Sequence, residues 1–104
     1  MATFLTYKRW RLRDGVDVQA VIDMVRDRIV PYYEVLDPTV RLGLEKIDGS
    51  PAVLATQRWP DRERRDRTIG GASFQAWLDA YGPLLDDWDR LVEFEAEWES
   101  NELI

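Results

Sequence analysis

The residues from 92 to 99 constrain the fold most, because apolar and acidic side chains alternate there without a break, as Val-Glu-Phe-Glu-Ala-Glu-Trp-Glu. Strict alternation predicts a β-strand with one packed face and one polar face. Residues 3–13 alternate as well, and one face of that run carries three arginines: Arg9, Arg11 and Arg13. Because the two charge rows are complementary, we expect the strands to be neighbours, with the arginine row facing Glu93, Glu95 and Glu97.

The first part of the chain predicts a helix and then a hairpin. Asp17 is a suitable N-cap for a helix that ends near Asp37-Pro38. Pro31 lacks the backbone N–H that would bond back one turn, so we expect a kink or a separate last turn there. Asp48-Gly49 separates two strand-like runs, residues 40–47 and 52–59, and this dipeptide is typical of a tight hairpin.

The second part predicts a charged connection over residues 60–72 and then a second helix. We expect Asp61 to cap a short helix that ends at Gly70-Gly71, and Ser73 to cap the longer helix that follows. Gly82-Pro83 should kink that longer helix. The resulting order, β-α-β-β-α-β, predicts an α+β, ferredoxin-like fold with a four-stranded antiparallel sheet, formed as a single domain by residues 1–104.

Composition excludes several classes of function. The chain has no Cys and no His, which excludes thiolate catalysis, a Ser-His-Asp triad and imidazole-bound metal or haem. The net charge is −6, and residues 68–104 hold one basic side chain, Arg90, so nucleic acid is a poor partner. No apolar run reaches the roughly 20 residues of a membrane span. We therefore expect a soluble, cytoplasmic protein that binds neither nucleic acid nor membranes.

Three loose patterns together resemble the dimeric α+β-barrel superfamily, and within it the antibiotic biosynthesis monooxygenase-like group. The first is a strand, the Asp14-Gly15 turn and a helix that ends in Pro31-Tyr32-Tyr33. The second is Arg58-Trp59 at the end of a strand, before a charged connection. The third is a helix with an aromatic stripe that leads into the acidic strand, built from Trp77, Tyr81, Pro83-Leu84-Leu85 and Trp88.

This resemblance implies a dimeric barrel, in which a second copy covers the sheet face that the helices leave open. That face would carry Leu5, Tyr7, Leu54 and Thr56 among charges, too apolar for free solvent. Some members of the superfamily oxygenate aromatic polyketides or quinols without metal or flavin, and others degrade haem. The haem degraders share the tryptophan matched by Trp59, but they use an asparagine near position 8 and a histidine, which this chain lacks.

The resemblance also implies a pocket between the sheet and the helices. The helix-facing strand positions are mostly apolar, and the polar exceptions are Thr6, Lys8 and Gln57, beside three tryptophans: Trp10, Trp59 and Trp98. Polar groups on a packed face cost free energy unless they are paired or wetted, which makes them pocket candidates. Lys8 is the candidate catalytic group, as a base or as a counter-ion for a phenolate or enolate, unless it extends to the sheet edge or pairs with a carboxylate.

The aromatic candidates have equally simple structural interpretations. Trp59 and Trp77 are substrate-pocket candidates, and Tyr33 and Tyr81 could orient a ligand oxygen, but all four also suit ordinary core packing. The arginine cluster Arg62, Arg64, Arg65 and Arg67 is interleaved with acidic residues. It could form a mobile lid over an anionic substrate, although solvated surface is the simpler interpretation.

Three functions fit these features. The first is a cofactor-independent monooxygenase for a small aromatic or quinol-type substrate, which needs no metal. The second is a non-catalytic small-ligand-binding or stress-associated dimer, and the third is a dimerisation module with a filled core. Oxygen uptake by metal-free protein would indicate the monooxygenase. Fluorescence quenching without turnover would indicate the ligand binder, and the absence of a cavity would indicate the dimerisation module.

Overall fold

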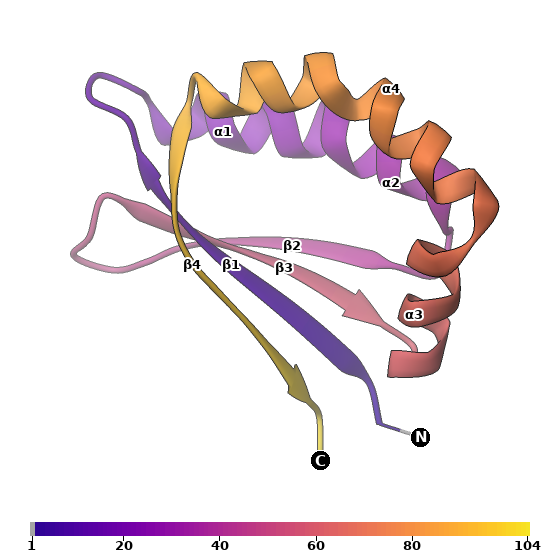
Figure 1. Cartoon of the computed structure of the whole chain (residues 1–104). Helices are drawn as coiled ribbons and strands as arrows, with labels where there is room; N and C mark the ends of the chain where they lie inside the picture. The colour runs from indigo at the N-terminus through magenta and orange to yellow at the C-terminus, as the bar shows by residue number, and fades with distance from the viewer. Residues whose placement is uncertain (1) are drawn as a thin grey trace.

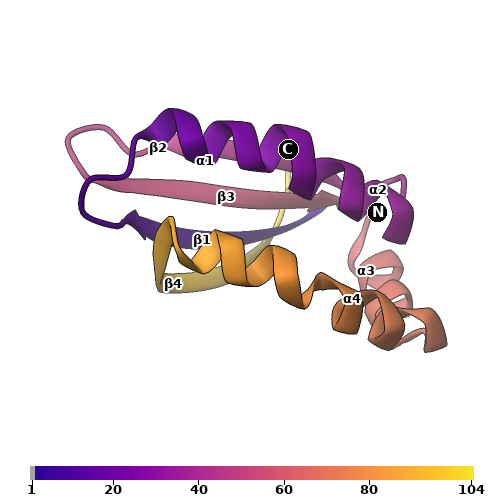
Figure 2. The same cartoon turned by 90° about the horizontal axis from the view of Figure 1, so that it is seen from above.

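The computed structural model describes residues 2–104, which form one antiparallel sheet covered by helices on one face (Figures 1 and 2). In chain order the elements are β1 (Phe4–Leu12), α1 (Val18–Met24), η1 (Val25–Ile29), α2 (Val30–Leu36), β2 (Arg41–Lys46), β3 (Ala52–Trp59), α3 (Arg62–Gly70), α4 (Ala72–Asp89) and β4 (Val92–Asn101). The strand order is β2-β3-β1-β4. This confirms the expected α+β, ferredoxin-like fold, with the first and last strands paired.

The first helical run begins where the sequence predicts and becomes irregular just before Pro31. Gln19 donates its backbone N–H to the Asp17 carboxylate at 2.8 Å, so Asp17 is the N-cap. Before Pro31 the helix widens into η1, a π-helical turn in which Val30 donates its N–H to the Val25 carbonyl. Pro31 cannot donate to the preceding turn, but the helical run continues without a break as α2, which begins at Val30, so the widened turn stands where we expected a kink or a separate last turn.

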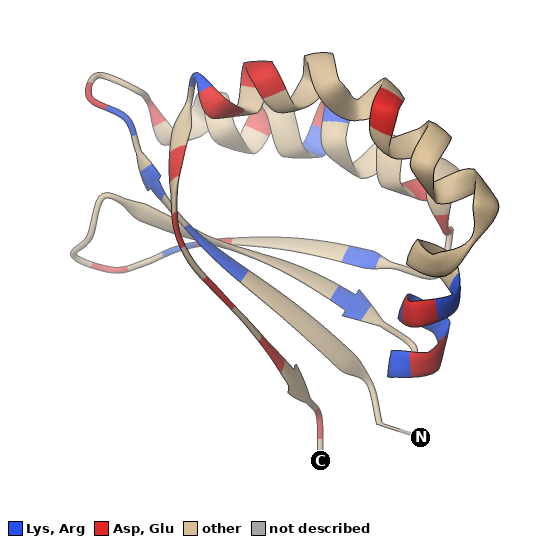
Figure 3. Cartoon of the chain, viewed as in Figure 1, with Lys and Arg blue, Asp and Glu red and all other residues tan. Residues whose placement is uncertain are grey.

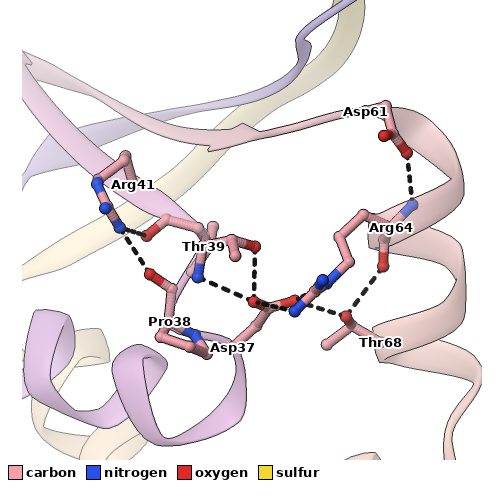
Figure 4. Close-up of polar contacts among 8 residues, drawn as sticks. Asp37, Pro38, Thr39, Arg41, Asp61, Arg64 and Thr68 are labelled. Atoms are coloured by element: carbon pink, nitrogen blue, oxygen red, sulfur yellow. Dashed lines mark hydrogen bonds and ion pairs between the residues drawn. The ribbon is translucent and has the colours of Figure 1, made fainter. Parts of the chain in front are cut away.

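The charged connection folds into α3, which is tied to the end of α2 by ionic hydrogen bonds (Figure 4). Asp61 caps α3, as expected, by accepting the backbone N–H of Arg64 at 2.8 Å. The Arg64 guanidinium donates to the buried carboxylate of Asp37 at 2.9 and 3.1 Å, and Thr68 donates to the same carboxylate at 2.8 Å. The segment is therefore a docked helix.

The longer helix α4 starts slightly earlier than expected. Gly71 occupies the N-cap position in place of Ser73, because the break between α3 and α4 is a single extended residue with φ −76° and ψ 156°. The helix is not interrupted at Pro83. Its buried face, Tyr81, Leu84 and Trp88, packs over the sheet beside Val21 and Met24 of α1.

The pairing of β1 with β4 contains a register shift that the alternating sequence hides. Arg9 bonds Glu95 at 3.1 Å and Arg11 forms an ion pair with Glu93, as expected. Trp10 is opposite Phe94, but Arg9 is opposite Ala96, so Glu95 is an extra, bulged residue. Beyond the bulge every side chain of β4 changes face.

The bulge corrects two expectations for the second half of β4. Glu97 lies opposite Lys8 on the helix-facing side, not in the row that faces the arginines. Trp98 lies opposite Tyr7 on the open face, where the two rings stack with centroids 5.4 Å apart, instead of facing the helices. Figure 3 shows the basic and acidic segments of β1 and β4 side by side.

Two apolar clusters hold the sheet and helices together. The larger unites α1, η1, α4, β3 and β4, and the smaller consists of Phe4, Val40 and Trp59 near α3. Arg65 of α3 covers the Phe4 ring at 4.6 Å. Across residues 2–104, none of the helices combines the length and apolar character that a bilayer crossing requires.

Candidate functional site

A cavity of about 130 Å³ lies between the sheet and the helices, in the position that the resemblance implies. Its walls come from β1, β2, β3, η1, α2 and α4. The polar side chains on the helix-facing side of these walls are Thr6, Lys8, Tyr33, Gln57 and Tyr81, whereas the Thr56 side chain lies on the open face with Tyr7. Trp10 and Trp88 supply aromatic surface, and their rings meet edge to face at 5.5 Å.

The structure brings together five of the seven residues that we selected from the sequence. Thr6, Lys8, Gln57, Tyr33 and Tyr81 all line this cavity. The other two, Trp59 and Trp77, do not reach its surface; each instead contacts a residue that does. The space between the sheet and the helices is therefore not the filled core that the third alternative requires.

Trp59 acts on the cavity through a hydrogen-bonded chain that we call the relay: Trp59, Gln57 and Tyr33. The Trp59 indole N–H donates to the Gln57 side-chain oxygen at 3.2 Å. The Gln57 amide nitrogen then donates to the Tyr33 hydroxyl at 3.0 Å. Trp59 is only 2% exposed, so this bond satisfies a donor that has no access to water.

Trp77 buttresses the two tyrosines from the helix side. Its ring stacks on Tyr81 at 5.1 Å and meets Tyr33 edge to face at 5.0 Å. It also exchanges hydrogen bonds with Tyr32, because its indole N–H donates to the Tyr32 carbonyl at 3.0 Å and the Tyr32 hydroxyl donates to the Trp77 carbonyl at 2.5 Å. Trp77 therefore fixes the orientation of both phenols.

Both cavity phenols are protonated at neutral pH, as phenols ordinarily are, and burial raises the pKa of each further. It raises the pKa of Tyr33, against the smaller opposing effect of the Tyr81 hydroxyl and the Gln57 amide. Burial also raises the pKa of Tyr81, and the neighbouring Tyr33 phenol raises it further. The two tyrosines are thus hydrogen-bond donors to a ligand, and neither is a base.

Lys8 lies where the cavity meets a second, wider hollow of about 410 Å³. The two spaces share Thr6, Lys8 and Gln57. The hollow is also bordered by Arg65 of α3 and by the glutamates that the bulge turns inward, Glu97 and Glu99. Within residues 2–104, Arg65 pairs with Glu99 at 3.2 Å, whereas Lys8 forms no ion pair.

Glu97 is the functional candidate that sequence reasoning missed. Alternation without a bulge assigns it to the arginine-facing row, and no local signal marks Glu95 as an extra residue. The structure instead gives Lys8 a carboxylate as its cross-strand neighbour. A ligand near Lys8 would therefore meet one cation and one anion at the mouth of the cavity.

Two of the four clustered arginines, Arg64 and Arg65, are held in structural ion pairs and are not free to clamp an anion. Arg64 bonds Asp37, and Arg65 bonds Asp66 at 2.8 Å as well as Glu99. Burial alone would raise the pKa of Asp37, but Arg64, Thr39 and Thr68 together hold it well below its usual range. Among residues 2–104, no three acidic side chains gather closely enough to hold a metal ion.

Comparison with known proteins supports the fold and does not extend to a sequence family. No protein-family model matches the chain, and no curated protein matches it. Among solved structures, a dimeric ferredoxin-like protein from an uncultured marine organism matches with a TM-score of 0.71 and 14% identity, covering 100% of this chain and 98% of that one.

Two further structures carry names related to oxygenase activity. SnoaB, a cofactor-independent oxygenase from Streptomyces nogalater, matches with a TM-score of 0.64 and 15% identity over 100% of this chain and 96% of that one. A candidate antibiotic biosynthesis monooxygenase from Chloroflexus aurantiacus matches with a TM-score of 0.56 and 15% identity over 98% and 94%. At these identities the likeness establishes the fold alone, an α+β, ferredoxin-like fold.

Proposed function

We propose that this protein is a cofactor-independent monooxygenase for a small planar aromatic or quinol-type substrate. The observation that carries the proposal is the cavity itself, which combines aromatic walls with one lysine and two protonated phenols. Such a cavity can hold a flat apolar ring and stabilise negative charge on one oxygen of it. The similarity in fold to SnoaB, described as a cofactor-independent oxygenase, is consistent with this chemistry.

In the proposed reaction the protein supplies binding, desolvation and charge. Trp10 and Trp88 hold the ring of the substrate, and Lys8 either removes a proton or balances the charge of the resulting anion. The phenol of Tyr33 or Tyr81 donates a hydrogen bond to the substrate oxygen. The electron-rich anion of an anthrone-type substrate then adds O₂ and regains the proton to form a hydroperoxide, which loses water, so that the CH₂ group becomes a carbonyl and the second oxygen atom leaves as water.

The proposal includes a homodimer formed through the open face of the sheet. Trp98 is 45% exposed there and stacks on Tyr7, although a stacked aromatic pair is ordinarily shielded from water. The marine ferredoxin-like protein of the same fold is described as dimeric. A light-scattering mass near 24 kDa at micromolar concentration is expected, and a mass near the 12.2 kDa of one chain would contradict the dimer.

The second candidate function is a small-ligand binder without turnover. It is favoured by the scarcity of general bases in the cavity: the chain has no histidine, and the phenols of Tyr33 and Tyr81 are protonated and cannot serve as bases. Under this alternative the same residues bind the ligand and no oxygen is consumed.

Oxygen uptake separates the two candidates. Oxygen uptake by metal-free wild-type protein and by Lys8→Met would be measured with anthrones and hydroquinones. Arg13→Met, just past the end of β1, is the control because it also removes one cation. Saturable uptake that falls at least tenfold in Lys8→Met and not in Arg13→Met is expected. Uptake that is equal in all three proteins would contradict the role of Lys8, and quenching of tryptophan fluorescence without uptake would favour the binder.

A further inference from the structure

The relay has a direction that chemistry fixes. An indole N–H can only donate, so the Gln57 oxygen must face Trp59, and the amide nitrogen must face Tyr33. The orientation of this amide is therefore set by its partners and is not a free choice between oxygen and nitrogen. The acceptor end of Gln57 points toward the core, and its donor end points toward the cavity.

This direction determines what the two phenols can offer. Because the Tyr33 oxygen accepts from Gln57, its own proton is available for donation. The Tyr33 and Tyr81 rings are close, with centroids 6.0 Å apart, and the two phenols can use only one of their two protons between themselves. The Tyr81 hydroxyl has no other hydrogen-bond partner within residues 2–104, so one phenol proton is left for the cavity.

Lys8 is a further hydrogen-bond donor in the cavity wall. Lys8 lines the cavity and its ammonium group donates only. Thr6 carries a hydroxyl that can both donate and accept, so it does not oppose this preference for an acceptor. The oriented groups of the wall are therefore donors.

We infer that the cavity selects its ligand by an acceptor oxygen, such as that of a ketone, a quinone or a phenolate, and that Trp59 is a positioning residue for this preference. Trp59 acts through Gln57, and Gln57 in turn acts on Tyr33. This inference rests on the proposed role of the cavity as the ligand site, but it does not depend on whether a bound ligand is oxygenated.

A matched pair of small bicyclic probes tests the preference under anaerobic conditions. 1-Indanone and indane share a ring frame, and only the ketone has an acceptor oxygen. We expect 1-indanone to bind about tenfold more tightly, the value of one to two hydrogen bonds, and to shift the NMR signal of the Trp59 indole N–H. Equal affinities, or no binding of either probe at millimolar concentration, would overturn the inference.

Two variants test the relay itself. Trp59→Phe keeps an aromatic ring but frees the Gln57 amide to rotate, so the ketone preference should fall about fivefold while the affinity for indane stays constant. Gln57→Glu places a carboxylate that draws the Tyr33 proton away from the cavity. It should weaken binding of 1-indanone and strengthen binding of 1-indanol, which can donate.

The controls keep the outcome independent of stability and of turnover. Trp98→Phe makes the same exchange on the opposite sheet face and should leave the ketone preference unchanged. Circular dichroism reports folding, and if Trp59→Phe does not fold, Gln57→Glu carries the test. An unchanged preference in a folded relay variant would overturn the inference. If the wild-type protein prefers the ketone but consumes no oxygen, the oxygenase proposal fails and the inference about ligand selection stands.

Discussion

Replacement of Asp37 by Asn should destabilise the protein more than any other single exchange of a charged residue in the α3 region. The Asp37 side chain is 2% exposed and accepts five hydrogen bonds from three residues, Thr39, Arg64 and Thr68. Asn can keep the bonds to Thr39 through its oxygen. Its NH₂ group, however, would face the guanidinium of Arg64 and lose the bond from Thr68 (Figure 4).

The expected cost follows from the burial of the two partners. Removing one member of a buried ion pair costs roughly 3–5 kcal/mol, because the other charge is left without compensation. Arg64 is 39% exposed on its side chain and can regain water, so we expect about 2–3 kcal/mol for Asp37→Asn. For a chain of this size that corresponds to a fall in Tm of roughly 10–20 °C.

Urea unfolding at a series of pH values provides the assay. The pKa of Asp37 is lowered in the folded protein, so its stabilising contribution is complete above the unfolded value of about 3.9. It is lost as the pH falls below that value toward the lower folded pKa. The difference between wild type and Asp37→Asn should therefore be constant from about pH 5 to 8 and should shrink below pH 4.

A matched control and a clear contrary result complete the test. Asp66→Asn removes a carboxylate from α3 that is 54% exposed, and we expect little change in stability. If Asp37→Asn unfolds at the same urea concentration as wild type at pH 7, or if its deficit does not diminish in acid, the Asp37 network does not hold α3 in place.

Two further predictions concern the sheet. In Gly43→Ala the new Cβ would lie 2.4 Å from the Thr56 hydroxyl, so we expect a loss of about 1–2 kcal/mol in urea unfolding that Thr56→Ala largely restores; an unchanged single variant would contradict the close approach. Deletion of Glu95 removes the extra residue and leaves a regular ladder, so the near-ultraviolet circular dichroism of the Tyr7–Trp98 pair should persist, and its loss would show that the bulge is assigned to the wrong residue.

Local signals were sufficient for most of the fold. The hairpin was predictable because Asp48-Gly49 permits a turn in which Gly49 has a φ of 70°, and strand β3 then occupies the expected residues 52–59. The pairing of β1 with β4 was predictable from their complementary charges, and the Arg9–Glu95 and Arg11–Glu93 ion pairs confirm it. The hairpin is decided by two adjacent residues, and the pairing of β1 with β4 by two complementary charge rows, each of which is visible within a single strand.

The features that sequence reasoning missed depend on partners that are distant in the chain. Asp37 marks a helix end in the sequence, but its role comes from Arg64, which is 27 residues away. Trp59 is equally suited to a pocket wall or to the core, and only the orientation of its indole toward Gln57 decides between them. The bulge at Glu95 is a property of the pairing with β1, and β4 alone alternates without interruption.

The bulge links the two proposals, because it divides β4 into halves that serve opposite faces. Before it, Val92 and Phe94 face the helices, as the alternation requires. After it, Trp98 joins Tyr7 on the open face, while Glu97 comes beside Lys8 at the mouth of the cavity. If Glu95 were kept but paired in a regular ladder, Trp98 would face the ligand space and Glu97 would lie on the face where the second copy is expected. Ligand binding and dimerisation therefore depend on the same irregularity, so a substitution that shifts the register of β4 should impair both together.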